Sequence, residues 1–454
     1  MMKMNVSDIA AATDAKWTGQ DIELNAVSID TRSLNPGDLY IAIKGERFDG
    51  HDFIDAAIQA GAGAVMVMRP VVTDVPQIVV NDTREALADL AKTWRRRLSL
   101  KVVGITGSNG KTSVKEMTAS LLKQAGQVLY THGNLNNDLG VPLTLLKITP
   151  QHDYAVVEMG ANHAGEIAFT SQLAQPHVAV LNNAGPAHLE GFGSLQGVAM
   201  AKGELIDSLA EDGVAVLNRD DAFFDYWQQR AGGRKVLSFG FHEAADVRAL
   251  NIRQRLDNGC FVTDFTMKTE YLEMPITLAL AGEHNVRNAL AASAATMALG
   301  LDAERIQQGL ADMQPVAGRL TPMMHSAGGL LLDDSYNANP ASVAAALKVL
   351  TQKGGEPWVV LGALGEMGED SPDIHRKLGA LMKTMGIEKL FATGADAEYA
   401  VEAFGNGGTF FQSQQTLIET LQQTLTAEAN ILVKGSRAQQ MEKVVAVLTN
   451  NDGN

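Results

Sequence analysis

The residue pattern with the clearest chemistry is a glycine loop, Thr106-Gly107-Ser108-Asn109-Gly110-Lys111-Thr112. Its glycines let the backbone turn N–H groups toward one anion, its lysine suits β- and γ-phosphate oxygens, and its threonine hydroxyl suits Mg²⁺. The loop therefore predicts that ATP binds at Gly107, Ser108, Asn109, Gly110, Lys111 and Thr112. It is a short form of the phosphate loop, because Ile105 stands where the full pattern has glycine. The alternative is an ordinary glycine turn capped by Thr112.

A metal bound with ATP needs further ligands, and two polar residues follow successive apolar runs. Glu158 ends the run 155–157, and His188 comes a few residues after the run 178–181. Neighbouring parallel strands bring their carboxyl ends to one edge of a sheet, so both side chains are candidate Mg²⁺ ligands. The alternative for each is a solvated group or one satisfied inside the core.

Asn285 and Asn288 are three residues apart in an alanine-rich helical segment. On a helix they share a face, and a carboxamide can pair with the N6 and N7 edge of adenine. Asn285 can equally be the N-cap of that helix, and the spacing does not decide between these interpretations.

Two features of the last third of the chain suit a nucleotide. Arg319 comes just after the break 314–318, where an arginine can reach the γ-phosphate when domains close. Asp334 ends an apolar run, as expected for a ribose or cation contact. The alternatives are a surface arginine in a turn and a segment, 335–340, that only caps the next helix.

The elements that position these residues predict an α/β protein of three domains. Residues 1–98 read as a small α/β domain, and residues 99–316 as a central parallel-sheet domain of the phosphate-loop ATPase type. Residues 317–454 alternate strands and helices as a Rossmann-like domain does. The length of 454 residues fits several cores, since a single core seldom organises so many.

Composition limits the partners. The net charge of −15 argues against a nucleic-acid or anionic-membrane surface, which would need a basic face. Cys260 is the single cysteine, so no intramolecular disulfide forms. The sequence has no secretory signal and no run of eighteen apolar residues, so we expect no membrane span. We expect a cytoplasmic monomer.

Taken together, the motifs resemble those of the Mur ligases along essentially the whole chain. The motifs that carry this resemblance are the glycine loop, Ser28 to Arg32, Lys44 to Phe53, Gly133 to Pro142, Glu158 to Asn162, Ala187 to Gly193, Asp334 to Asn339 and Leu432 to Arg437. The block from Lys44 to Phe53 is similar to the branch of the family that adds D-alanyl-D-alanine to UDP-N-acetylmuramoyl-tripeptide.

This resemblance implies an ATP-dependent ligase that forms an acyl phosphate on the tripeptide carboxylate. It implies γ-phosphate contacts from Lys111 and Arg319, and Mg²⁺ held near Thr112, Glu158, His188 and a carbamylated Lys202. It also implies adenosine contacts at Asn285, Asn288 and Asp334. The UDP-linked substrate would lie near Ser28, Asp30, Thr31, Arg32, Asn136, Asn137 and Asn162, and the dipeptide near Lys434 and Ser436.

One stretch departs from the family pattern. The chain has Ala363 where the family commonly has aspartate in Gly-Asp-Met-x-Glu-Leu-Gly, so we assign Ala363 no catalytic role; Glu366 stays a candidate. A plain pair between Lys202 and Glu204 is the alternative to the carbamate. A folylpolyglutamate-synthase type of ligase and a nucleotide-binding regulator with little ATPase activity are the alternative functions.

Overall fold

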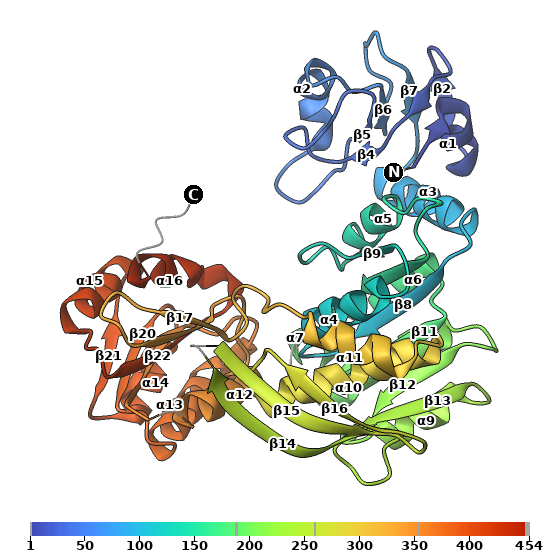
Figure 1. Ribbon diagram of the computed structural model, residues 1–454. Helices are drawn as coiled ribbons and strands as arrows, with labels where there is room; N and C mark the ends of the chain where they lie inside the picture. The colour runs from blue at the N-terminus through green and yellow to red at the C-terminus, as the bar shows by residue number, and fades with distance from the viewer. Residues whose placement is uncertain (1, 187–188, 258–259, 353, 450–454) are drawn as a thin grey trace.

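The computed structural model describes residues 2–186, 189–257, 260–352 and 354–449. Three large sheets with their helices follow one another along the chain; in Figure 1 the N-terminal part lies above the central one and the C-terminal part lies to its left. The predicted α/β class is confirmed. The exact boundaries between domains stay a prediction. In the described part of the chain, no helix combines the length and the apolar character that crossing a bilayer would require.

The N-terminal part holds a small two-stranded sheet, β1 (Met4–Asn5) with β3 (Glu23–Leu24), and a five-stranded sheet. The order of the larger sheet is β2 (Lys16–Thr18), β7 (Gln77–Val79), β6 (Ala64–Val67), β5 (Leu39–Ile41) and β4 (Val27–Ser28). Its helices are α1 (Val6–Ala12), η1 (Gly50–Phe53), α2 (Ile54–Gln59) and α3 (Thr83–Arg96). Asp82 starts α3 by accepting the N–H groups of Arg84 and Glu85.

The central sheet has nine strands, and its parallel part reads as the apolar runs that two covered faces require. The order is β16 (Glu273–Leu278), β15 (Cys260–Lys268), β14 (Val247–Asp257), β13 (Lys235–Gly240), β12 (Val214–Asn218), β11 (Val178–Leu181), β8 (Lys101–Thr106), β10 (Tyr154–Glu158) and β9 (Val128–Tyr130). The helices are α4 (Lys111–Lys123), α5 (Gly140–Leu145), α6 (Glu166–Ala174), α7 (Leu189–Phe192), α8 (Leu195–Asp207), α9 (Phe224–Ala231), α10 (Glu283–Ala298) and α11 (Ala303–Ala311).

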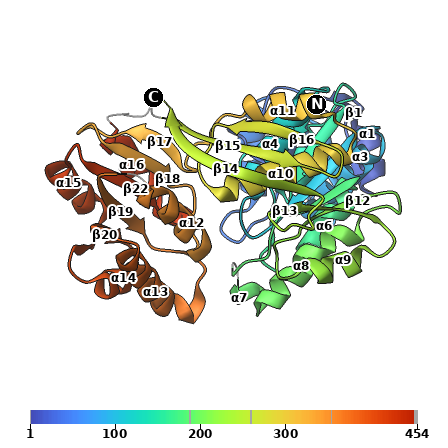
Figure 2. The same cartoon turned by 60° about the horizontal axis from the view of Figure 1, so that its bottom comes forward.

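The antiparallel strands β14, β15 and β16 extend this sheet, which the sequence analysis did not foresee. They alternate buried and exposed residues, as β16 shows with Met274, Ile276 and Leu278 inside. Figure 2 shows β14 and β15 reaching toward the C-terminal part. There Phe261, 5% exposed, joins the core around Leu332. The hairpin is therefore a packed connection between the central and C-terminal sheets.

The C-terminal sheet has six strands, five of them parallel neighbours, as in a Rossmann-like fold. The order is β17 (Thr321–Met324), β18 (Leu330–Asp334), β22 (Ala429–Lys434), β19 (Glu356–Gly362), β20 (Lys389–Thr393) and β21 (Gly408–Phe411). The helices are α12 (Pro340–Thr351), η2 (Gly368–Asp370), α13 (Ser371–Thr384), α14 (Ala397–Phe404), α15 (Gln414–Thr424), η3 (Arg437–Gln439) and α16 (Glu442–Leu448).

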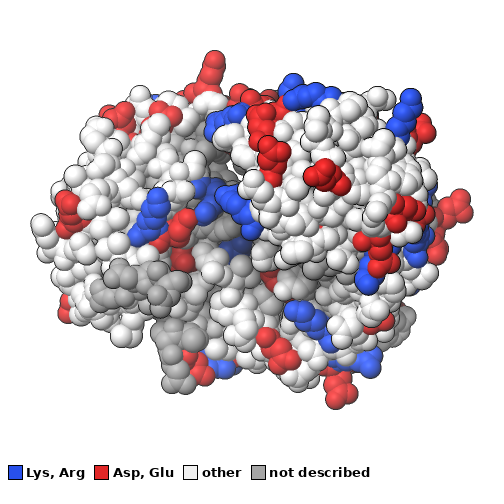
Figure 3. All heavy atoms as spheres, turned by 90° about the horizontal axis from the view of Figure 1, so that it is seen from above, with Lys and Arg blue, Asp and Glu red and all other residues white. Residues whose placement is uncertain are grey.

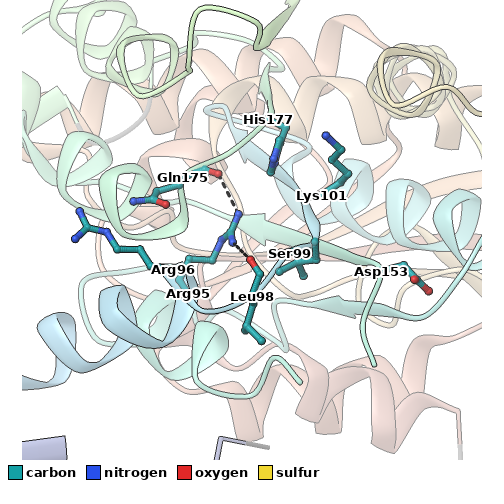
Figure 4. A pocket seen from close by; sticks show the side chains of 9 residues that line it. Arg95, Arg96, Leu98, Ser99, Lys101, Asp153, Gln175 and His177 are labelled. Atoms are coloured by element: carbon teal, nitrogen blue, oxygen red, sulfur yellow. Dashed lines mark hydrogen bonds between the residues drawn. The ribbon is translucent and has the colours of Figure 1, made fainter. Parts of the chain in front are cut away.

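A hollow of about 510 Å³ lies at the amino ends of β8, β10 and β11, at the edge of the sheet opposite the glycine loop (Figure 4). At its floor Arg95 donates to the carbonyl oxygens of Ala174 (2.9 Å), Leu98 (2.9 Å) and, more weakly, Gln175 (3.5 Å). These carbonyls end α6 and the turn after α3, where a cation is favoured. Arg95 is thus a tether between the two helices, and the hollow needs no ligand to explain its charge.

We expect Arg95→Met to lower the melting temperature by several degrees. A hydrogen bond to a charged group is worth about 2 kcal/mol, and the change leaves helix-end carbonyls without their donor. Differential scanning fluorimetry of this variant beside Arg96→Met, an exposed neighbour at the same hollow, measures the difference. Equal melting temperatures for the two variants would contradict the tether.

Candidate active site

The glycine loop joins the buried strand β8 to the N-terminus of α4. Gly110 precedes the first helical residue with φ +78°, a left-handed conformation that favours glycine. A Cβ there would lie 2.5 Å from both the Asn182 Nδ2 and the Asn288 Oδ1 atoms. Gly110 therefore provides both the turn and the room for two asparagines. Among the described residues, no side chain caps α4, so the alternative of a turn capped by Thr112 is wrong.

Lys111 lies inside this loop, with its Nζ atom donating to the carbonyl oxygen of Gly107 at 2.8 Å. Burial lowers the pKa of Lys111, Glu158 acts to raise it, and Arg319 adds to the lowering. The N–H groups in the first turn of α4 have no partners within the helix. Lysine and helix end together form a ready anion site.

Glu158 ends β10 beside the loop and is 2% exposed. Its Oε1 atom accepts from Asn136 Nδ2 at 2.8 Å, and its backbone N–H donates to Thr131 Oγ1 at 3.0 Å. Its Oε2 atom is buried and has no hydrogen-bond partner within the described residues. A buried carboxylate oxygen that accepts no hydrogen bond is a suitable ligand for a divalent cation.

Besides Glu158, the described part of the chain offers fewer side-chain ligands at this place than a divalent cation needs. Within the described ranges, no three His, Cys, Asp or Glu side chains cluster closely enough to hold a metal by themselves. His188, the other predicted ligand, lies outside the described residues. A site with one carboxylate and the Thr112 hydroxyl fits Mg²⁺, which commonly takes its other oxygens from water and nucleotide phosphates.

Lys202 projects from α8 and is 3% exposed. Its pKa lies well below the ordinary value because of burial and, second, the charge of Lys111. Glu204 does not pair with it: the Glu204 carboxylate accepts the N–H groups of Gly165 (2.8 Å) and Ala168 (3.0 Å) at the start of α6. The expectation of a plain Lys202–Glu204 pair is therefore wrong.

Asn285 and Asn288 share one face of α10, as their spacing predicted, and both are buried. Asn285 is not an N-cap, because Gly282 holds that position and the Asn285 side chain donates to the carbonyl of Ala281 at 2.8 Å. Asn288 Nδ2 donates to Asn285 Oδ1 at 3.2 Å. The two amides thus bond to each other and to the protein, and an adenine contact stays a prediction for both.

Arg319 reaches the loop from the C-terminal part, so the interpretation as a surface arginine is wrong. Its Nη2 atom donates to Thr112 Oγ1 at 3.0 Å, and its guanidinium lies 4.4 Å from the centroid of the Tyr336 ring. The Nε atom is buried without a hydrogen-bond partner in the described part of the chain. The Arg319 guanidinium thus lies beside the loop and still has an N–H group that can donate to a ligand.

Asn339 makes a second contact between the parts. Its Nδ2 atom donates to Asn109 Oδ1 at 2.5 Å, while its Oδ1 atom accepts the Ser342 N–H and caps α12. The expectation that residues 335–340 cap the next helix is confirmed. The same cap also holds the glycine loop.

Lys434 and Ser436, which were predicted to lie near the dipeptide, are both buried. Lys434 Nζ donates to Asp334 Oδ2 and to the carbonyl of Asn337, and Ser436 Oγ donates to the carbonyl of Ala363. Burial raises the pKa of Asp334, and the Lys434 charge opposes this. Ala363, at the position that commonly carries aspartate in the family, has no carboxylate and bonds to Ser436 through its backbone carbonyl.

The predicted residues for the UDP-linked substrate fall into two groups. Ser28 ends β4, and Asp30, Thr31 and Arg32 lie in the turn after it, where the Arg32 side chain holds the pKa of Asp30 at about 2 by donating to its carboxylate. Asn136, Asn137 and Asn162 belong to the central part. Figure 3 shows a hollow between the parts with Lys and Arg side chains at its rim, which suits anionic substrates despite the overall negative charge.

Sequence reasoning missed two residues that contact the loop, and one buried histidine near Lys434. Asn182 and Asn183 follow β11, and their side chains bond to Asn109. The rule applied to Glu158, a polar residue after a buried strand, would have found both. His284 precedes Asn285; burial, then the charges of Lys434 and Arg287, lower its pKa to about 4.

Family models match most of the chain. The Mur ligase family catalytic domain matches residues 23–95, the Mur ligase middle domain residues 105–296, and the Mur ligase glutamate ligase domain residues 318–437. These segments correspond to the three sheets in order.

Relatives and solved structures agree over nearly the full length. The chain is 45% identical to UDP-N-acetylmuramoyl-tripeptide–D-alanyl-D-alanine ligase of Escherichia coli strain K12, covering 99% of both chains. It is similar to a MurF crystal structure from Acinetobacter baumannii (TM-score 0.92, 38% identity, 99% of both chains). It is also similar to MurF ligase from Thermotoga maritima in complex with ADP (TM-score 0.83, 29% identity, 94% of this chain and 97% of the other). This protein belongs to the Mur ligase family.

Proposed function

We propose that this chain is an ATP-dependent ligase that joins D-alanyl-D-alanine to UDP-N-acetylmuramoyl-tripeptide. The observation that carries this proposal is that two cationic side chains from different parts of the chain meet at the glycine loop, where Lys111 bonds to Gly107 and Arg319 bonds to Thr112. The 45% identical relative of the same name, matched end to end, supports the choice of substrates.

The reaction has two steps with balanced bonds. A carboxylate oxygen of the tripeptide attacks the γ-phosphorus of ATP, the bond to the β–γ bridging oxygen breaks, and ADP leaves with that oxygen. The amine of D-alanyl-D-alanine then attacks the acyl carbon, phosphate leaves, and the amine loses a proton. Lys111 and Arg319 offset the charge on the γ-phosphate oxygens during the first step.

Mg²⁺ would be held by Thr112, Glu158, His188 and a modified Lys202, where it neutralises phosphate charge. The Glu158 Oε2 atom supports this assignment, because it is buried and has no hydrogen-bond partner among the residues that the structure describes. Asn285, Asn288 and Asp334 serve the adenosine. The turn from Ser28 to Arg32 and residues Asn136, Asn137 and Asn162 serve the UDP-linked substrate, and the region of Lys434 and Ser436 serves the dipeptide.

Three further assignments complete the proposal. The domains span residues 1–98, 99–316 and 317–454, and the chain acts as a monomer. The reaction takes place in the cytoplasm, where ATP is supplied. A folylpolyglutamate-synthase activity is less favoured, because an end-to-end relative at 45% identity acts, by its name, on a muramoyl tripeptide.

The proposed function predicts that phosphate release requires both UDP-N-acetylmuramoyl-tripeptide and D-alanyl-D-alanine. Mass spectrometry should show UDP-N-acetylmuramoyl-pentapeptide in equal amount to ADP. The control is Lys111→Ala, which should lose about 10²-fold or more in turnover while melting normally, because a phosphate contact in the transition state is removed. If phosphate release does not depend on the two substrates, the nucleotide-binding regulator would be indicated instead.

Lys202 has the properties that carbamate formation needs. A neutral amine attacks the carbon of CO₂, an N–C bond forms, and a proton leaves, so an amine that readily loses its proton is favoured. Lys202 is such an amine, because it is buried near the charge of Lys111. The product is an anionic oxygen ligand in place of a cation.

We expect Lys202→Ala to lose most activity, and short carboxylic acids such as acetate to restore part of it. The acid would occupy the space of the missing carbamate and supply its oxygens. Ligation rates against acetate concentration check this, with Lys115→Ala, a buried lysine outside the assigned ligands, as the control that acetate should not rescue. Full activity of Lys202→Ala without acid would make Lys202 a structural residue.

A further inference from the structure

We infer that Asn182 is a positioning residue for ATP, which acts by holding the glycine loop in its phosphate-binding shape. This inference rests on the proposed function for its meaning, and it concerns a side chain that the motifs did not single out. Asn182 follows β11 and is 1% exposed. It lies against the loop from the strand next to β8.

The Asn182 amide connects the loop to helix α10. Its Nδ2 atom donates to the carbonyl oxygen of Asn109 at 2.9 Å and to Asn288 Oδ1 at 3.0 Å. Both donors of the amide are used, and each partner is an acceptor. A rotated amide would place oxygen against the Asn109 carbonyl, so the hydrogen bonds define its orientation.

The backbone of Asn182 is held just as firmly. Its N–H group donates to the carbonyl of Thr106 at 3.0 Å, and its carbonyl accepts from Asn218 Nδ2 at 2.8 Å. A Cβ on Gly107 would lie 3.0 Å from the Asn182 Cβ, and one on Gly110 would lie 2.5 Å from its Nδ2. Asn182 therefore sets the path of the loop at both glycines.

The neighbouring Asn183 fixes a different part of the loop. Its carbonyl accepts from the Ser108 N–H at 3.0 Å, and its Oδ1 atom accepts from the Asn109 N–H at 2.8 Å. These two N–H groups are thus used by Asn183. In the described part of the chain, the N–H groups in the first turn of α4 that have no partner within the helix remain for an anion, and their direction depends on where Asn109 and Gly110 are held.

Asn288 then acts on the loop through Asn182. Its Oδ1 atom accepts from Asn182, and its Nδ2 atom donates to Asn285, which donates in turn to the Ala281 carbonyl. This chain of amides ties α10 to the loop. Loss of Asn288 and loss of Asn182 should therefore remove the same restraint, and their effects on ATP affinity should not add.

The test is calorimetric binding of Mg²⁺ and ADP, which needs neither ligase substrate, beside the KM for ATP and for D-alanyl-D-alanine. We expect Asn182→Ala to weaken ADP binding and raise the KM for ATP by about tenfold, with the KM for the dipeptide unchanged. Asn182→Asp should be at least as severe, since its carboxylate would face two acceptor oxygens. Loss of packing alone predicts the reverse order, because aspartate fills the space and alanine does not.

The control is Thr296→Ala, a buried residue of α10 whose hydroxyl donates to the carbonyl of Ala292 in the same helix. It should lower the melting temperature with little effect on ADP affinity. In the double variant of Asn182 and Asn288, the loss should match that of the stronger single variant. Normal ADP affinity in folded Asn182→Asp, equal losses in Thr296→Ala, or fully additive losses would each overturn the inference.

Two further measurements keep the outcomes separate. If Asn182→Ala does not fold, Asn182→Ser replaces it, because serine keeps one donor and should fall between wild type and Asn182→Asp. If the wild type binds ADP but forms no pentapeptide, the proposed function fails while the ADP measurements still decide the role of Asn182.

Discussion

The first turn of α4 leaves N–H groups that the helix itself cannot satisfy, and the loop before it must aim them at one point. A flexible glycine loop would lose that aim when no nucleotide is bound. Here the loop is held by side-chain amides, since Asn182 and Asn183 bond to Asn109, and Asn339 reaches the same residue from the C-terminal part. Binding energy for phosphate is then not spent on ordering the loop.

The same loop is the place where the parts of the chain meet. Arg319 bonds to Thr112, and Asp334 with Lys434 stands behind it as a buried ion pair. A buried ion pair of this kind contributes little to stability, so we infer that its role here is to fix the position of the end of β18. The β14–β15 hairpin is a further connection between the central and C-terminal parts, because its Phe261 packs into the C-terminal core. Chemistry that needs groups from two domains requires such fixed points.

Most of the fold could be predicted from local pattern. Apolar runs such as 102–106 and 178–181, separated by helical periods, indicated parallel strands, and both are buried strands in the structure. The antiparallel strands 247–278 were missed because their one-sided alternation is interrupted and mixed with charges. The motif around Lys111 predicted the local geometry of the candidate site, a buried strand followed by a loop and a helix, while the role of Lys111 stays a prediction.

Contacts between distant segments could not be predicted in this way. Nothing local to Asn288 shows that it meets Asn182, 106 residues away. Spacing alone left Asn285 open between adenine contact and helix cap, and only the position of Gly282 excludes the cap. The family resemblance placed the dipeptide near Lys434, but nothing local to Lys434 shows its partner Asp334, which lies 100 residues earlier on a neighbouring strand.

The central claim is that the γ-phosphate passes to the tripeptide carboxylate before the amide forms. Tripeptide labelled with ¹⁸O in that carboxylate tests this directly, because the oxygen that attacks phosphorus leaves with the phosphate. The account predicts inorganic phosphate carrying one ¹⁸O atom for each pentapeptide formed. Label found in AMP, or unlabelled phosphate alongside pentapeptide, would contradict it.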